Sequence, residues 1–284
     1  MPKRKRRMTK EKIAKCIKEG RGQGEGKNYK PWFRIQDVPS QGIVSRIRGW
    51  KTGRIHHLLS RLERSFFLVF DYSPIIKDIR EQFPLPLEET IEIAEECGIR
   101  HPVCVGTKDP NVITTDFLLT LETGTDEEIA LAVTVKPVSK LHDEQKQRRI
   151  IEKFEIERRF WQRRRTRWMI LTEREVSVVL LRNLERVYHR LHIEDMHPLT
   201  NDDVNKIEAE MLPHIMEGRL PLNLITTGCD ERLGLEAGTS LTVVFHLIAQ
   251  RRWQVDLSKK IRSDERLVIL NLKELAVPKR KRVA

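Results

Sequence analysis

The stretch VITTDFLLTLETGTDEEIALAVTVKP, residues 112–137, decides the fold, because it contains two strand-like segments separated by a polar turn. The first, 112–121, is rich in β-branched and apolar residues, and the second, 130–136, alternates between two faces. Its two faces are Leu131, Val133 and Val135 on one side, and Ala132, Thr134 and Lys136 on the other. Pro137 ends the second segment because proline cannot donate to a ladder of hydrogen bonds. The stretch therefore predicts two neighbouring strands at the centre of a sheet.

Helical patterns flank this pair of strands. Apolar residues from Leu58 to Phe70 recur at helical spacing, which predicts a helix from His56 that ends at 71–74. Further patterns predict a strand at 75–80, a helix at 89–97, a helix at 141–165, a strand at 168–172 and a helix at 175–191. This order indicates an α/β domain with a mixed sheet flanked by helices.

The last third of the chain has a different pattern. It predicts helices at 201–217, 222–227 and 237–252, followed by strands at 253–257 and 266–272 around the charged turn SKKIRSDE. Three helices and a two-stranded wing are typical of a small, mainly helical winged-helix domain. We therefore expect a basic extension at 1–55, a main domain at 56–175, a connection at 176–200, the winged helix at 201–272 and a basic tail at 273–284.

Composition excludes several classes of protein. The chain has 284 residues, 39% of them hydrophobic and 33% charged, and no apolar run long enough to span a bilayer. The basic N-terminus has no apolar segment behind it, so it is not a secretory signal, and we expect a cytoplasmic protein without membrane contact. The four cysteines are scattered, which indicates neither a zinc site nor disulfides.

Positive charge is concentrated in three places. Residues 1–12, 145–167 and 273–284 carry net charges of +6, +7 and +4, whereas the whole chain carries +12, so the remainder is net acidic. This distribution is typical of a surface that binds a polyanion. For the two tails, solvated ends that bind nothing are an equal alternative to phosphate contact. The internal segment is predicted to be a helix with one apolar face, so its basic residues can bind phosphate next to a packed core.

Two glutamates interrupt apolar helix faces. Glu63 has Leu59, Phe66, Phe67 and Phe70 as its helical neighbours, and Glu157 has a similar apolar set. Buried carboxylates require a paired charge or a bound cation. For each one alone, an ion pair with an arginine is a sufficient explanation.

Asp116 and Lys136 lie on the two central strands. Asp116 interrupts the uncharged run ITTDFLLTL, and adjacent strands would bring it close to Lys136. The pair alone could be a cross-strand ion pair. Together with Glu63 and Glu157, however, it forms a site for a hard divalent cation with oxygen ligands. Next to a basic surface, such a site favours phosphodiester hydrolysis.

Several ordered motifs make the first 170 or so residues resemble a known family. These motifs are IKEGRGQGEGKNYKPW at 17–32, KTGRIHHLLSRLE at 51–63, DIREQFPL at 78–85, TTDFL at 114–118, VKP at 135–137 and EIERRFWQ at 155–162. The order of acid, strands and lysine resembles the restriction-endonuclease-like PD-(D/E)xK nucleases. More specifically, the chain resembles TnsA, the endonuclease subunit of heteromeric transposases.

The resemblance implies a catalytic set of Glu63, Asp116 and Lys136, with Glu157 as an additional carboxylate or an organiser of the site. Glu63 and Asp116 would hold Mg²⁺, for which Mn²⁺ can substitute, and Lys136 would act at the attacking water. Thr134 stands where the family usually has Glu or Gln. Its hydroxyl and the backbone carbonyl of Val135 are the further expected metal ligands.

The resemblance also implies partners. The family cleaves the 5′ ends of a transposon, a TnsB-like DDE transposase processes the 3′ ends, and a TnsC-like AAA+ regulator docks on the C-terminal domain. We expect double-stranded DNA to contact Lys51, Arg54, His56, Arg158, Arg159, Arg163, Arg251 and Arg252, with Lys259 and Lys260 as further candidates. An inactive assembly subunit and a stand-alone restriction-type nuclease are the alternative functions.

Overall fold

The computed structural model describes residues 8–37, 42–104, 108–124, 127–141 and 144–272. These residues form two compact units, which divide after Val176. The expected tail at 273–284 lies outside the described residues. Within the described ranges, no helix combines the length and the apolar character needed to cross a membrane.

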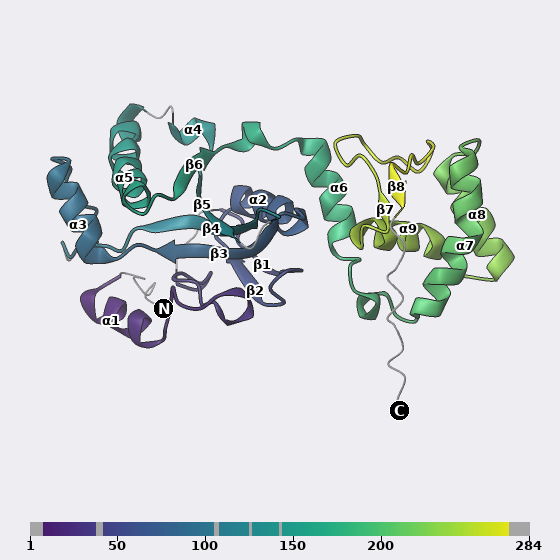
Figure 1. The fold of residues 1–284 in the computed structure, drawn as a ribbon, viewed down its shortest axis with the longest axis horizontal. Coiled ribbons are helices and arrows are strands. Elements are labelled where there is room, and N and C mark those ends of the chain that lie inside the picture. Colours follow the sequence, from purple (N-terminus) through teal and green to yellow (C-terminus); the bar gives the residue numbers. More distant parts are fainter. Residues whose placement is uncertain (1–7, 38–41, 105–107, 125–126, 142–143, 273–284) are drawn as a thin grey trace, which may run out of the picture. The chain divides into compact units, whose positions relative to one another are not determined.

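A four-stranded mixed sheet forms the centre of the first unit (Figure 1). Its strands, in spatial order, are β3 (Ile76–Pro84), β4 (Thr114–Glu122), β5 (Glu128–Val135) and β6 (Arg167–Leu171). The first three run antiparallel, and β6 pairs with β5 in parallel. The predicted central pair is confirmed, with Phe117 opposite Val133 and Leu118 opposite Ala132.

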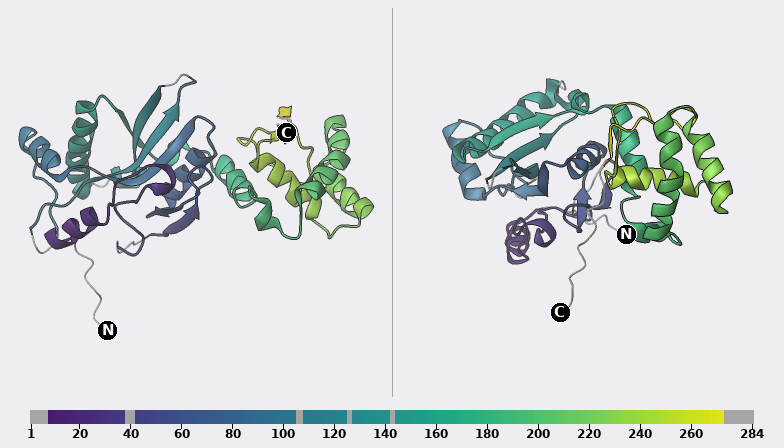
Figure 2. Two further views of the ribbon diagram at one scale, coloured as in Figure 1. Left: turned by 60° about the horizontal axis from the view of Figure 1, so that its bottom comes forward. Right: turned by 45° about the vertical axis from the view of Figure 1, so that its right-hand side comes forward.

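Helices cover both faces of this sheet. On one face, Leu118 and Ala132 pack in a core with Ile93 of α3 (Leu87–Glu96) and with Ile156 and Phe160 of α5 (Glu144–Arg163). On the other face, Phe117 packs against α2 (Arg61–Tyr72) through Phe70, at 5.4 Å between ring centroids. Figure 2 shows the same layers from two further sides. The alternation of apolar side chains along β4 therefore anchors a helix on each face.

The prediction of a helix starting at His56 is wrong at its beginning. Residues Ile55–Leu58 form strand β2, which pairs with β1 (Ser45–Arg48) in an antiparallel hairpin. Helix α2 begins only at Arg61, after the N-cap residue Ser60. The apolar side chains of β2 fall in phase with those of α2, so spacing alone did not separate the two elements.

The N-terminal segment is part of the first unit and not a mere extension. Helix α1 (Lys10–Lys18) buries Ile13 and Cys16 in a core with Trp32 and Cys104. The glycine-rich loop that follows, with the short helix η1 (Gly26–Asn28), lies against β3. A Cβ at Gly22 would lie 2.1 Å from Cγ of Pro84, so only glycine permits this contact.

The second unit is mainly helical. Its elements are α6 (Val178–Tyr188), η3 (Ile193–Met196), α7 (Asn201–Glu217), α8 (Leu222–Leu233), α9 (Thr239–Ala249), β7 (Trp253–Gln254) and β8 (Asn271–Leu272). Short elements α4 (Val138–Leu141) and η2 (Glu173–Glu175) belong to the first unit. Helix α9 is the core of the second unit, because every residue from Val243 to Ala249 is buried.

The predicted wing is much shorter than expected. Strands β7 and β8 pair over only two residues each. The segment between them packs on α6 instead, where the Asn183 amide donates to the carbonyls of Leu257 and Lys259 at 2.8 and 2.7 Å. The charged SKKIRSDE stretch is therefore held by helix α6 through its backbone and does not form a regular hairpin.

Candidate active site

The N-terminus of α2 fixes the first candidate carboxylate. The Ser60 hydroxyl accepts the Glu63 amide at 3.1 Å and donates to Glu63 Oε1 at 2.9 Å. The Leu59 amide donates to Glu63 Oε2 at 2.8 Å. Glu63 is therefore the acidic member of a helix-capping arrangement, and the S-x-x-E spacing at 60–63 is the signal from which this position can be found.

Glu63 is buried, as its apolar helical neighbours predicted. Burial and the neighbouring charge of Asp116 raise its pKa to about 8, although three neutral hydrogen-bond donors act in the opposite direction. No arginine or lysine pairs with it among these contacts. A buried carboxylate next to a second carboxylate is costly when both are ionised, which distinguishes this site from a structural ion pair.

Asp116 lies on β4, directly before Phe117, which is opposite Val133 of β5. The Val135 amide donates to Asp116 Oδ2 at 2.7 Å. Burial raises the pKa of Asp116, whereas this hydrogen bond and the charges of Lys136 and Lys153 act to lower it. The predicted approach of Asp116 and Lys136 is therefore present as an electrostatic interaction between neighbouring strands.

Glu157 is held by two threonine hydroxyls. Thr115 of β4 donates to Glu157 Oε1 at 2.7 Å, and Thr134 of β5 donates to the same oxygen. Each hydroxyl also accepts an indole N–H, Thr115 from Trp161 at 2.8 Å and Thr134 from Trp168 at 3.1 Å. Burial raises the pKa of Glu157 to about 7. The Thr134 hydroxyl is therefore directed toward Glu157 of α5 and is already engaged in two hydrogen bonds.

Lys153 is a site residue that sequence reasoning missed. It lies one helical turn before Glu157 on α5, and its charge acts on both Asp116 and Glu157. The residue is exposed, and partial desolvation of its ammonium group, together with the charge of Lys136, lowers its pKa. Its i, i+4 spacing from Glu157 was the available signal, obscured by the many other basic residues of this helix.

The donor set fits a magnesium ion. Among the residues that the structure describes, no three His, Cys, Asp or Glu side chains form a metal cage by themselves. Mg²⁺ does not need one, because it is usually bound by one or two carboxylates, while waters and substrate phosphates complete its octahedron. Glu63 and Asp116 supply two carboxylates that repel each other, and a divalent cation would relieve that repulsion.

Two predicted DNA contacts are wrong, because these side chains are inside the first unit. His56 is fully buried, and its Nδ1 lies 2.8 Å from Glu81 Oε2. The guanidinium of Arg54 binds both oxygens of Glu81, at 2.8 and 2.5 Å. These charges hold the pKa of Glu81 well below its usual range. The network is a buried structural ion cluster that joins β2 to β3.

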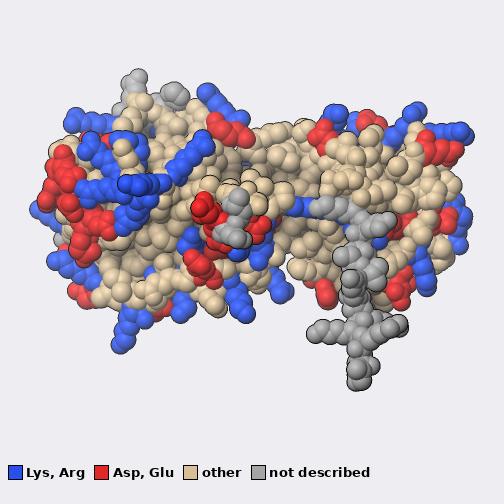
Figure 3. All heavy atoms as spheres, viewed as in Figure 1, with Lys and Arg blue, Asp and Glu red and all other residues tan. Residues whose placement is uncertain are grey.

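The predicted arginines of α5 lie on the surface but are ion-paired. Arg158 and Arg159 both bind Glu155, and Arg163 binds Glu96 of α3 at 2.6 Å. Figure 3 shows basic and acidic side chains intermixed over α3 and α5. DNA contact by these arginines would require exchanging carboxylate partners for phosphates, which exposed pairs do at small cost.

The predicted contacts at the end of α9 differ from one another. Arg252 is largely buried and binds Glu208 of α7, which also accepts the Trp253 indole N–H at 2.8 Å. The guanidinium of Arg252 is therefore committed to an ion pair within the second unit. Arg251 is half-buried, while Lys259 and Lys260 are exposed.

The predicted DNA contact Lys51 lies in the first unit, where its backbone amide donates to Asp71 at 3.1 Å.

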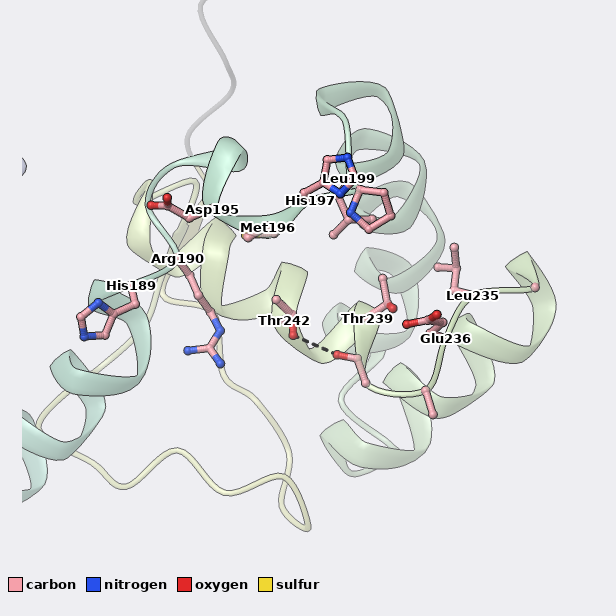
Figure 4. Close-up of a pocket in the computed structure, with 14 residues that line it drawn as sticks. His189, Arg190, Asp195, Met196, His197, Leu199, Leu235, Glu236, Thr239 and Thr242 are labelled. Atoms are coloured by element: carbon pink, nitrogen blue, oxygen red, sulfur yellow. Dashed lines mark hydrogen bonds between the residues drawn. The ribbon is translucent and has the colours of Figure 1, made fainter.

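The second unit contains a hollow of about 790 Å³ between the end of α6, η3 and the start of α9 (Figure 4). Its lining includes the basic Arg190 and the acidic Asp195 and Glu236, so it carries charges of both signs. The carboxylate of Asp230 already binds the amides of Gly238 and Ser240 at the start of α9, each at 2.8 Å. This helix end is therefore closed to an external anion.

The sheet and the site together define a class of protein. A mixed sheet flanked by helices, with carboxylates and a lysine gathered around its two central strands, is the architecture of a restriction-endonuclease-like nuclease domain.

Comparisons with known proteins identify the family. A family model described as "TnsA-like endonuclease N terminal" matches residues 73–173, and one described as "TnsA endonuclease C terminal" matches residues 175–257. The transposition protein TnsA of transposon Tn7 from Escherichia coli is 38% identical over 258 residues, which cover 89% of this chain and 88% of that protein. The chain therefore belongs to the TnsA endonuclease family and is a phosphodiester-hydrolysing nuclease of Tn7-like transposition.

Proposed function

We propose that this protein is the Mg²⁺-dependent subunit that cleaves the 5′ ends of a transposon during cut-and-paste transposition. The observation that carries the proposal is the mutual placement of Glu63, Asp116 and Lys136 around the central strands, with both carboxyl pKa values raised by burial. A structural ion pair would instead lower the pKa values of its acids, as seen at Glu81.

Each residue has a distinct role in this proposal. Glu63 and Asp116 hold the cation, with the Val135 carbonyl as a further oxygen ligand. When bound, Mg²⁺ supplies Lewis-acid polarisation of the scissile phosphate and a more acidic water. Lys136 places positive charge beside Asp116, where it stabilises the negative charge that develops on the phosphate. Lys153 adds a second cation, and Glu157 orders the strand ends through Thr115 and Thr134.

The proposed substrate is double-stranded DNA at the transposon ends. We expect a TnsB-like DDE transposase to process the 3′ strands and a TnsC-like AAA+ regulator to dock on the second unit. We assign DNA contact to the arginines of α5, to Lys51 and Arg251, and to the exposed Lys259 and Lys260. Arg54, His56 and Arg252 are left aside because their side chains are largely withdrawn from solvent and paired with Glu81 or Glu208.

The test is cleavage of transposon-end DNA with Mg²⁺ or Mn²⁺, with the TnsB-like partner added or omitted. We expect 5′-end cuts that require the metal and the partner, and we expect Asp116→Ala to abolish them. Glu128→Ala is the matched control, since Glu128 is an exposed acid on the neighbouring strand. Cutting by Asp116→Ala at the parental rate would refute the assigned site. Absence of cutting by the parent with every component present would favour an assembly role, and cutting without the partner a stand-alone nuclease.

A further inference from the structure

Gln82 has an unusual backbone conformation for a residue within a strand. Its φ is +51°. Among the described residues, the other non-glycine residues with positive φ lie outside the β-strands, whereas Gln82 lies within β3. This conformation costs free energy for any residue with a Cβ, and it persists only where surrounding contacts enforce it. Gln82 is also 3% exposed, so its polar side chain is committed to the interior.

Both strands of the β3–β4 pair change face at this residue. Glu81 contacts His56, which packs on Phe67 of α2, and Phe117 packs on Phe70 of α2. Two residues along, Phe83 packs on Trp161 of α5 at 5.8 Å between centroids, and Thr115 accepts the Trp161 indole N–H.

In a regular strand, residues two apart share a face, so the alternation is broken in both strands. The break falls on the pair Gln82 and Asp116, which lie opposite each other between the registered pairs 81–117 and 83–115. The left-handed conformation of Gln82 is therefore part of the distortion that interrupts the face-to-face alternation of side chains on β4 at Asp116.

The side chain of Gln82 connects this distortion to α2. Its amide Nε2 donates to Glu63 Oε2 at 3.1 Å, while its backbone carbonyl accepts the Trp32 amide at 3.3 Å. The amide is a neutral donor, so it fixes the orientation of the Glu63 carboxylate without cancelling the charge that a cation requires. An arginine or lysine at this position would compete with the cation for the same oxygen.

We propose that Gln82 is a positioning residue that sets the Glu63 carboxylate against Asp116 for binding a divalent cation. The inference rests on the proposed function of the site. Residues that orient metal ligands in this way typically contribute about 10–100-fold to metal affinity. The loss of the amide should therefore weaken metal binding far more than it weakens the fold.

Two variants separate the amide from the backbone. Gln82→Met retains side-chain length and the same backbone demand but cannot donate, whereas Gln82→Gly relieves the backbone and also lacks the amide. Gln250→Met, at an exposed glutamine, is the matched control. The full-length protein is titrated calorimetrically with Ca²⁺ and with Mn²⁺, its melting temperature is recorded, and cleavage is followed against Mn²⁺ concentration.

We expect both Gln82 variants to bind Mn²⁺ about tenfold or more weakly than the parent, with cleavage largely recovered at high Mn²⁺. Parental affinity in both variants would overturn the proposal, and so would a loss in Gln82→Met that Gln82→Gly restores, because that result assigns the effect to the backbone. If one variant fails to fold, the other decides alone. Failure of the parent to bind metal or cleave would instead refute the proposed function.

Discussion

At the scale of single residues, Glu157 presents a choice between a ligand and an organiser. Its Oε1 accepts two threonine hydroxyls, and burial raises its pKa to about 7, so neutral and charged forms coexist near neutral pH. A glutamine carbonyl can accept the same two hydrogen bonds without a charge. We therefore expect Glu157→Gln to unfold at the same urea concentration as the parent protein and to retain most of the DNA-cleavage activity.

Glu157→Ala is the contrasting variant. It leaves the Thr115 and Thr134 hydroxyls without their acceptor and leaves a cavity beside Trp161, which should cost about 2–4 kcal/mol of unfolding free energy. Urea denaturation and the cleavage assay measure both effects. Loss of cleavage in Glu157→Gln with unchanged stability would instead make the carboxylate a direct participant.

Residue identity predicted part of the site because some residues violate a pattern. Glu63 and Glu157 lie on apolar helix faces, and Asp116 lies in an apolar strand, so each is visible without coordinates. The role of Gln82 cannot be seen in this way, because a polar residue is ordinary in a half-buried strand and the sequence does not reveal its positive φ. The burial of Arg54 and His56 is likewise invisible in the sequence, because it depends on contacts with Glu81, 25 or more residues away in the chain.

At the scale of elements, the start of α2 couples a helix cap to a candidate ligand. Ser60 both caps the helix and donates to Glu63. Ser60→Ala should therefore cost about 1 kcal/mol in thermal or urea unfolding and also reduce cleavage by releasing the carboxylate. Ser60→Thr is the control, since threonine can make both hydrogen bonds. Unchanged cleavage in a measurably destabilised Ser60→Ala would separate the cap from the site.

The link between α7 and the end of α9 gives a second prediction at this scale. Arg252 and Glu208 pair with most of both side chains excluded from solvent. Removing one member leaves the other charge poorly solvated, so we expect Arg252→Ala to destabilise the protein by about 2–4 kcal/mol without a specific loss of DNA affinity. Lys259→Ala, at an exposed lysine, should leave the melting temperature unchanged. Weaker DNA binding by Arg252→Ala at parental stability would restore Arg252 as a DNA contact.

Element positions were predictable where periodicity had a single interpretation. The central strands and α7 follow directly from alternation and from helical spacing between clear end signals. The start of α2 did not, because pairing of β2 with β1 imposes a strand on residues whose apolar spacing also suits a helix. The β7–β8 pair is short because the Asn183 amide donates to the carbonyls of Leu257 and Lys259, which a longer hairpin would use for strand pairing. Sequence spacing does not show this contact.

At the scale of the whole molecule, the buried carboxyl groups set how stability depends on pH. Glu63 and Glu157 have pKa values raised to about 8 and about 7, so the folded protein binds their protons more tightly than the unfolded chain does. Their contribution is fully present below about pH 4.5 and is lost as the pH rises through 7 to 8. Glu81 has a lowered pKa, so its contribution is lost in the opposite direction, as the pH falls into the acid range.

The metal-free protein should therefore be most stable in mildly acidic solution and should lose on the order of 3 kcal/mol or more between about pH 5 and pH 9. Chemical unfolding across this range, with chelator present, measures the loss. Ca²⁺ or Mg²⁺ should restore stability mainly at the alkaline end, because the cation binds the ionised carboxylates and competes with their protons. Glu63→Gln should reduce the alkaline loss, leaving the part due to Glu157, and should abolish the metal effect, whereas Glu128→Ala should change neither. If the cation stabilised Glu63→Gln as strongly as the parent, the metal would be bound elsewhere in the molecule, and the raised pKa of Glu63 would need another explanation.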